Sequence, residues 1–124
     1  MKLHQNFSGK VFEIVALEIA NGSCPASEYL ANLEAKSPDT YASMLRQIEY
    51  RADNLMMRSS KPLRGDRYKD LFRLEQGGER LCYMYLPGKQ AIVLLNGYCK
   101  TDVEKTEYER ARQYRIDLLD HIDK

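Results

Sequence analysis

The chain has 124 residues, of which 44% are apolar and 30% charged, and its formal net charge is +1. These values indicate a single globular domain over residues 1–124, and they exclude a polycation that binds nucleic acid through net charge alone. No apolar run reaches the ~20 residues of a membrane span, and residues 1–10 lack the apolar stretch of a signal peptide. We therefore expect a cytoplasmic protein without a membrane partner.

The content of cysteine and histidine argues against metal chemistry. Cys24, Cys82 and Cys99 are widely spaced and form no CxxC pair, and the chain has only His4 and His121. A zinc site and a disulfide framework both need closer or more numerous ligands. We expect no metal site and no cofactor, with Cys82 and Cys99 as small apolar residues of strands.

The first half of the chain predicts one strand followed by two helices. Residues 11–20, VFEIVALEIA, are β-branched and apolar, which favours a strand, and NGS at 21–23 is a turn signal. The segment 24–36 reads as a helix with Pro25 in its first turn. A second helix begins at SPDT, where Ser37 can cap, and its apolar residues recur at steps of three and four up to about Arg58.

The second half predicts three strands and a closing helix. After a loop at 59–67, the runs 68–76, 79–86 and 91–100 are separated by GG and PGKQ turns and form an antiparallel meander. The segment from 103 to the end is helical. One face of it carries Tyr108, Ala111, Arg115, Leu118 and Ile122, with charge elsewhere. The sequence thus predicts an α+β fold, a small antiparallel sheet with helices packed on it, in the order β-α-α-β-β-β-α.

Positive charge is concentrated in residues 58–73. This segment holds six bases and two acids, a local charge of +4. The bases are Arg58, Lys61, Arg64, Arg67, Lys69 and Arg73. Basic residues interleaved with aromatic ones on an open sheet suit a phosphate backbone and stacked bases, so Lys61, Arg64, Arg67 and Lys69 are candidate phosphate-binding residues for RNA. A solvated surface is the alternative.

The neighbouring hairpin carries polar residues at its end. A plain two-stranded alignment about the PGKQ turn places Leu86 opposite Ala91 and Arg80 opposite Gly97, which would leave room for a ligand beside the guanidinium. Tyr98 leads out of the same hairpin. Alternatively, Arg80 pairs with Glu75 or Asp70 at the sheet edge.

No serine-nucleophile elbow, Walker loop or HExxH motif is present. Catalysis would have to depend on cations and tyrosines. RNA cleavage by the RNA's own 2′-hydroxyl meets this condition, because the substrate supplies the nucleophile and the protein orients it and stabilises the charged phosphorane.

Residues 61–111 resemble the RelE/ParE toxin superfamily, and most closely its HigB-like, phage-associated branch. The resemblance depends on the order and spacing of several short motifs, from KPLRG through LFRLE and ERLCY to VLLNGYCK and EYERA. The matching residues are Leu63, Gly65, Leu71, Phe72, Leu74, Arg80, Leu81, Tyr83, Leu94, Leu95, Tyr98, Lys100, Glu107, Tyr108 and Ala111.

The resemblance implies the toxin of a type II toxin–antitoxin system, an endoribonuclease that cleaves mRNA in the ribosomal A site and is neutralised by a cognate antitoxin. The implied catalytic residues are Arg80, Tyr98, Lys100 and Arg73. Four departures separate the chain from the family pattern. The family's E-L-R is Arg73-Leu74-Glu75 here, with the charges exchanged, and the second lysine of its K-K is Thr101. Asn96 stands where histidine is common, and the net charge is lower than is typical of these toxins. The partners implied are mRNA, the ribosome and an antitoxin of helix-turn-helix type. The alternatives are a ParE-like toxin that binds DNA gyrase and an inactive phage-derived binding module.

Overall fold

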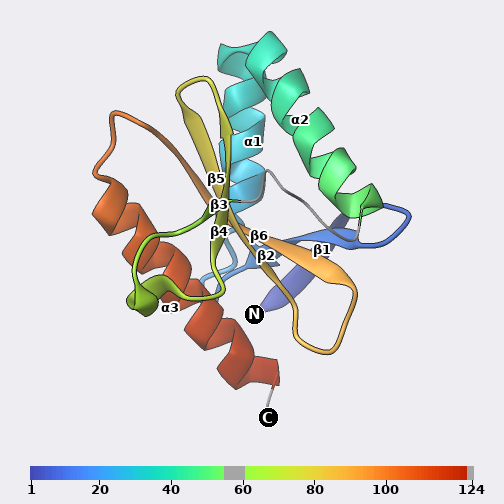
Figure 1. The fold of residues 1–124 in the computed structure, drawn as a ribbon, viewed down its shortest axis with the longest axis vertical. Helices are drawn as coiled ribbons and strands as arrows, with labels where there is room; N and C mark the ends of the chain where they lie inside the picture. Colours follow the sequence, from blue (N-terminus) through green and yellow to red (C-terminus); the bar gives the residue numbers. More distant parts are fainter. Residues whose placement is uncertain (55–60, 123–124) are drawn as a thin grey trace.

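The computed structural model describes residues 1–54 and 61–122, and it contains a six-stranded mixed sheet between helices (Figure 1). The strand order across the sheet is β1-β2-β6-β5-β4-β3. The strands are β1 (Lys2–Ser8), β2 (Glu13–Glu18), β3 (Lys61–Pro62), β4 (Phe72–Gln76), β5 (Glu79–Tyr85) and β6 (Ala91–Cys99). The helices are α1 (Pro25–Lys36), α2 (Pro38–Asp53), a short 3-10 turn η1 (Asp66–Tyr68) and α3 (Glu104–Ile122).

The predicted α+β architecture is confirmed, with two additions and one change of strand direction. The additions are β1, which pairs antiparallel with β2, and the two-residue β3 at the other edge. The sheet is not purely antiparallel, because β2 runs parallel to β6. The parallel pair follows from the topology: after β2, helices α1 and α2 carry the chain across one face of the sheet to its far edge, and the strands β3, β4, β5 and β6 then lead back until β6 lies beside β2.

Both proline-led helices begin where the sequence predicts them. Pro25 and Pro38 occupy the first turns of α1 and α2, where a missing N–H costs nothing. Ser37 lies at the N-cap of α2, but its hydroxyl donates to the hydroxyl of Thr40, 2.9 Å away, and does not cap a backbone N–H. Helix α2 ends at Asp53, earlier than predicted, and Arg58 lies outside the described residues.

The sheet buries two apolar layers. Helices α1 and α2 cover one face through residues such as Leu30, Leu33 and Met44, and α3 covers the other (Figure 1). Strands β5 and β6 are buried on both faces, as their uninterrupted apolar runs predict. On α3, Ala111 and Leu118 are buried as expected, but Ile122 is 48% exposed.

The register of the β5–β6 hairpin differs from the plain alignment. Leu86 does face Ala91, since its N–H donates to the Ala91 carbonyl at 2.9 Å. A bulge between Cys82 and Tyr83 then shifts the pairing by one residue, so that Arg80 faces Tyr98 rather than Gly97.

No open space remains beside Gly97, contrary to the prediction. The ring of Tyr29 from α1 occupies it: a Cβ added at Gly97 would lie 2.1 Å from the Tyr29 ring. The absence of a side chain at this position therefore serves helix packing and not ligand binding.

The 68–76 strand is also shorter than predicted. Residues 66–68 form the 3-10 turn, and the strand begins only at Phe72. Asp70 precedes it in the left-handed region at φ 67°. Among the described residues, no helix combines the length and the apolar character needed to cross a bilayer.

Candidate active site

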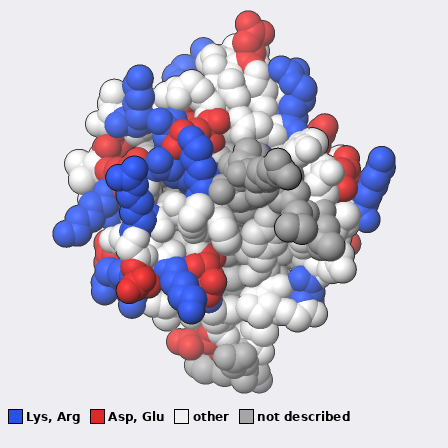
Figure 2. Space-filling view, in the orientation of Figure 1, with Lys and Arg blue, Asp and Glu red and all other residues white. Residues whose placement is uncertain are grey.

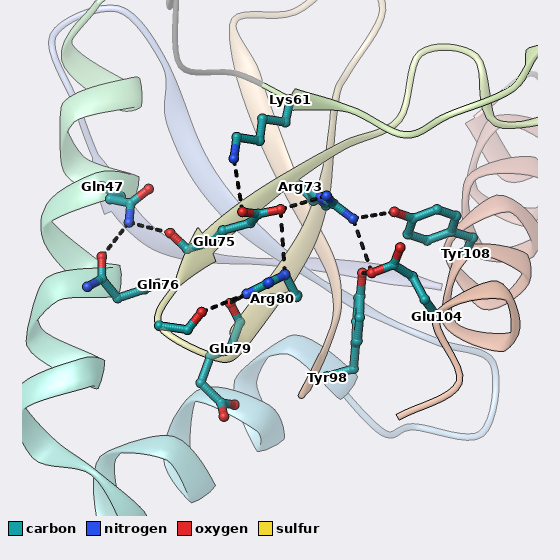
Figure 3. A network of polar contacts seen from close by, with 11 residues as sticks. Gln47, Lys61, Arg73, Glu75, Gln76, Glu79, Arg80, Tyr98, Glu104 and Tyr108 are labelled. Atoms are coloured by element: carbon teal, nitrogen blue, oxygen red, sulfur yellow. Dashed lines mark hydrogen bonds and ion pairs between the residues drawn. The ribbon is translucent and has the colours of Figure 1, made fainter. Parts of the chain in front are cut away.

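Three cations converge on the carboxylate of Glu75 (Figure 3). The Lys61 ammonium lies 2.9 Å from its Oε2, the Arg73 Nη2 lies 2.6 Å from Oε1, and the Arg80 Nε lies 3.6 Å from Oε1. The side chains of Arg73, Glu75 and Arg80 are 15–21% exposed, whereas that of Lys61 is 58% exposed. The junction is therefore a partly buried charge cluster with one solvent-facing ammonium.

The sheet register explains why these residues meet. Lys61 of β3 pairs with Arg73 of β4, and Glu75 of β4 pairs with Arg80 of β5. Arg73 and Glu75 are two residues apart on one strand, so their side chains point to the same face. This is the α3 side of the sheet, since their β4 neighbour Leu74 packs in the α1–α2 core. Three neighbouring strands thus contribute one charged row.

A second group of polar side chains links this row to α3. Arg73 Nη1 contacts the Tyr108 hydroxyl and lies 3.1 Å from Glu104 Oε2. The Tyr98 hydroxyl donates to the same Glu104 oxygen at 3.2 Å. Because Glu104 and Tyr108 are four residues apart in the first turns of α3, they project side by side over the ends of the strands (Figure 3).

The electrostatics of the cluster keep both carboxylates charged. The hydrogen bond from Lys61 lowers the pKa of Glu75 and, with the charges of Arg73 and Arg80, outweighs the opposing effect of burial. Burial opposes ionisation of Glu104, but Tyr108 and Arg73 outweigh it, so its pKa is also lowered. Each carboxylate is therefore an acceptor at neutral pH.

The two tyrosines remain protonated. Burial raises the pKa of Tyr98 and also that of Tyr108, and it is the main cause of the shift in both. They act as hydrogen-bonding phenols, not as phenolate bases.

Arg80 is also held by the backbone of the β4–β5 turn. Its Nη1 donates to the carbonyls of Gly77 at 2.9 Å and Glu79 at 3.0 Å. The predicted alternative, pairing with Glu75, is present, whereas the Asp70 carboxylate instead lies 3.5 Å from Arg115. The guanidinium is thereby fixed with one edge in the turn and the other toward Glu75.

Two buried nitrogen atoms in the cluster have unused donor capacity. The Nε atoms of Arg73 and Arg80 make no hydrogen bond with any described residue. An unsatisfied buried donor is costly, but both atoms are covered in this structure and Arg80 Nε faces Glu75 Oε1 at 3.6 Å, so a phosphate oxygen would reach them only after the covering side chains move.

The remaining predicted site residues lie outside the cluster. Arg67 makes two contacts with Glu109 of α3, at 2.7 and 2.8 Å, which raise the pKa of Arg67 and lower that of Glu109 to about 2. Arg64 and Lys69 are exposed and make no ion pair with other described residues. Of the predicted site residues, the structure therefore brings together Lys61, Arg73, Arg80 and Tyr98. It leaves Arg64, Arg67 and Lys69 outside the cluster.

Lys100 lies next to the cluster without joining it. Its backbone N–H donates to the Gly78 carbonyl at 2.7 Å, and its side-chain stem runs about 3.5 Å from where a Gly78 Cβ would lie. Since Arg80 is bonded to the adjoining Gly77, both cations border the same turn.

Figure 2 shows basic side chains gathered on one side of the molecule, at the left of the view, with acidic side chains among them. The positive charge of residues 61–73 is therefore partly neutralised in space, by Glu75 of β4 and by carboxylates of α3. Arg67 pairs with Glu109, and Arg73 lies beside Glu104.

Sequence reasoning did not find two members of the cluster as site residues, Glu104 and the hydroxyl of Tyr108. Their spacing of four at the start of an acidic helix was a visible signal, but only the tertiary fold shows which strand they face. Glu75 was foreseen as an ion-pair partner and not as the centre of the cluster. In the described part of the chain, no group of three or more His, Cys, Asp or Glu side chains could hold a metal ion.

Comparison of the sequence with family models gives no match, and comparison with curated proteins gives none either.

Proposed function

We propose that this protein is the toxin of a type II toxin–antitoxin system and cleaves messenger RNA on the ribosome, using the RNA 2′-hydroxyl as nucleophile. The observation that carries the proposal is the convergence of Lys61, Arg73 and Arg80 with two phenols on one sheet face. The RelE/HigB-like motif order of residues 61–111 supports it independently. The substrate implies a cytoplasmic location.

In the reaction, the 2′-oxygen attacks the adjacent phosphorus and its proton passes to the Glu75 carboxylate. The bond from phosphorus to the 5′-oxygen breaks, which leaves a 2′,3′-cyclic phosphate. Arg73 and Arg80 stabilise the additional negative charge of the phosphorane, since a guanidinium donates two parallel hydrogen bonds to phosphate oxygens.

A lowered pKa makes Glu75 a weak base. Most of the acceleration must therefore come from orientation of the 2′-hydroxyl and from charge stabilisation, as expected for a cation-rich site. The exchange of charges between Arg73 and Glu75 relative to the family pattern keeps a carboxylate and a guanidinium in the row.

The departing 5′-oxygen needs a proton. Lys61 and Lys100 supply the two nearby ammonium groups, one beside Glu75 and one at the β4–β5 turn. Separate Lys61→Ala and Lys100→Ala variants distinguish them: loss of the general acid slows cleavage of a normal phosphodiester, and a substrate with a 5′-thio leaving group, which needs no proton, restores the rate.

A second candidate function, an inactive binding module, is favoured by one observation. Arg80 has carbonyl and carboxylate partners that would hold it in place in the absence of any substrate. In both cases the natural partner that we propose is an antitoxin of helix-turn-helix type that covers the cluster.

Induced expression in bacteria separates these candidates. The nuclease predicts growth arrest with loss of mRNA for the wild type and normal growth for Arg80→Ala at equal protein levels. The matched control is Lys89→Ala, which removes an exposed cation from the β5–β6 turn and should remain toxic. Equal growth of wild type and Arg80→Ala, without RNA loss, contradicts the nuclease and leaves the binding module.

A further inference from the structure

A polar hollow lies between α2 and the end of β4, separate from the charge cluster. Its volume is about 510 Å³, and its lining comes from one face of α2 together with Gln76. The lining residues are Ser43, Arg46, Gln47, Tyr50, Arg51 and Gln76. The lining is therefore polar and includes two arginines and one tyrosine, and the space is large enough for part of a small ligand.

Tyr50 is 57% exposed, and among the described residues it is the one aromatic residue in the group of exposed large apolar residues. A ring that is more than half exposed contributes little to the core, and it offers a flat face on which a nucleic acid base can stack.

Arg46 lies one turn before Tyr50 on the same face of α2. Its Nη2 donates to the Ser43 hydroxyl at 3.0 Å, and it makes no ion pair within the described residues. The other donors of the guanidinium are therefore available to an anion, in the planar arrangement that suits a phosphate.

Hydrogen bonds link the lining of the hollow to β4, the strand that carries Arg73 and Glu75 of the cluster. Gln47 Nε2 donates to the backbone carbonyl of Glu75 at 2.8 Å and to Gln76 Oε1 at 2.7 Å. Gln47 and Gln76, which line the hollow, thus connect it to the backbone of Glu75, whose carboxylate lies on the other face of the sheet (Figure 3). A strand of RNA whose reacting phosphate is at Arg73 and Arg80 can continue around this edge of the sheet.

We propose that this hollow is a second nucleotide subsite for single-stranded RNA, in which Tyr50 stacks on a base and Arg46 binds the adjoining phosphate. The choice of RNA as ligand rests on the proposed function. The subsite has no part in bond cleavage; it fixes the position of the strand, and therefore should affect affinity and KM more than kcat.

The test is binding of two fluorescent single-stranded hexanucleotides of the same sequence to the full chain. One has a 2′-deoxy sugar at every position, which prevents cleavage, and the other has ribose throughout. Stacking on an aromatic ring is lost in Tyr50→Ala, so we expect affinity to fall about 5- to 100-fold. Tyr50→Phe keeps the ring and should bind within about twofold of the wild type.

Salt dependence tests Arg46 separately. For single strands, each neutralised phosphate contributes about 0.7 to the slope of log affinity against log salt, so Arg46→Ala should lower this slope by about 0.7. Tyr50→Ala should leave the slope unchanged. Lys89→Ala, far along the chain in the β5–β6 turn, is the matched control and should change neither quantity.

Unchanged affinity in both Tyr50→Ala and Arg46→Ala overturns the subsite while leaving cleavage by the cluster intact. Competition by AMP as strong as that by the hexamer also overturns it, because the hollow would then be a site for a free mononucleotide. The reverse result, weakened RNA binding in both variants of a protein that cleaves nothing, supports the subsite and contradicts the proposed nuclease.

Discussion

Replacement of Glu75 by glutamine tests the centre of the charge cluster, because this one carboxylate faces three cations. Its contacts with Lys61, Arg73 and Arg80 are 2.9, 2.6 and 3.6 Å. The exposed Lys61 pair contributes at most about 1 kcal/mol. The two arginine pairs are more buried but keep other partners, so we expect Glu75→Gln to lower the free energy of unfolding by about 2–3 kcal/mol.

For a domain of this size, such a loss corresponds to a fall in Tm of roughly 6–15 °C. The pH dependence gives a second readout. Because the folded-state pKa of Glu75 lies below its ordinary value of 4.5, its contribution is present above that pH and is lost as the pH falls through the folded value. The difference in the free energy of unfolding between wild type and Glu75→Gln should therefore have its full size at pH 7 and disappear in acid.

The same substitution separates binding from chemistry. Removal of a negative charge next to the arginines should tighten RNA binding about fivefold, from ~1 kcal/mol for unit charges 4 Å apart in water. Loss of the base should slow cleavage about 100-fold, the low end of the general-base range. Denaturation by urea, fluorescence anisotropy and single-turnover cleavage measure the three effects below the Tm of both proteins.

Glu109→Gln is the matched control, since it removes an ion-paired carboxylate from α3 outside the cluster. It should leave Tm and cleavage close to those of the wild type. If Glu75→Gln is as stable as wild type at pH 7, then the Glu75 carboxylate does not stabilise the cluster, and if the variant binds RNA more weakly while folded, then the carboxylate does not compete with RNA for its cations.

Three further predictions follow from particular contacts. Gly97→Ala should lower the free energy of unfolding by about 1–3 kcal/mol in urea denaturation, because the new Cβ would meet the ring of Tyr29; unchanged stability would contradict this packing. Burial raises the pKa of the Cys82 thiol to about 12, so in the native state at pH 8 it should resist a thiol reagent, whereas the partly exposed Cys99 should react faster; equal rates would refute the assignment. Arg80→Lys keeps the charge but loses the fork of donors, so single-turnover cleavage should slow about 100-fold, and wild-type activity would exclude a guanidinium-specific role.

The elements that sequence predicted well are those with strong local signals. The proline-led starts of α1 and α2 and the apolar runs of β5 and β6 all lie where local chemistry places them. Strand β1 was missed because it lies at the sheet edge, where most of its side chains are exposed and carry no apolar pattern.

The errors at the candidate site have a different origin. The β5–β6 bulge changes the partner of Arg80 from Gly97 to Tyr98, and nothing in the two strands' apolar patterns specifies it. The ring of Tyr29 that fills the space at Gly97 comes from α1, 68 positions earlier in the chain. Such contacts arise from tertiary packing, so local sequence could identify Arg80 as unusual but not its surroundings.

The central claim is that the charge cluster, with Tyr98 and Tyr108 beside it, cleaves RNA through the 2′-hydroxyl. Identification of the chemical groups at the two ends of the cleaved RNA tests this claim most directly. Purified protein is incubated with programmed ribosomes, and the termini of the cleaved mRNA are determined. The proposed reaction predicts 2′,3′-cyclic phosphate and 5′-hydroxyl ends with the wild type, and none with Arg73→Ala or Arg80→Ala. Ends carrying a 5′-phosphate and a 3′-hydroxyl, or undiminished cleavage by both variants, would contradict the claim.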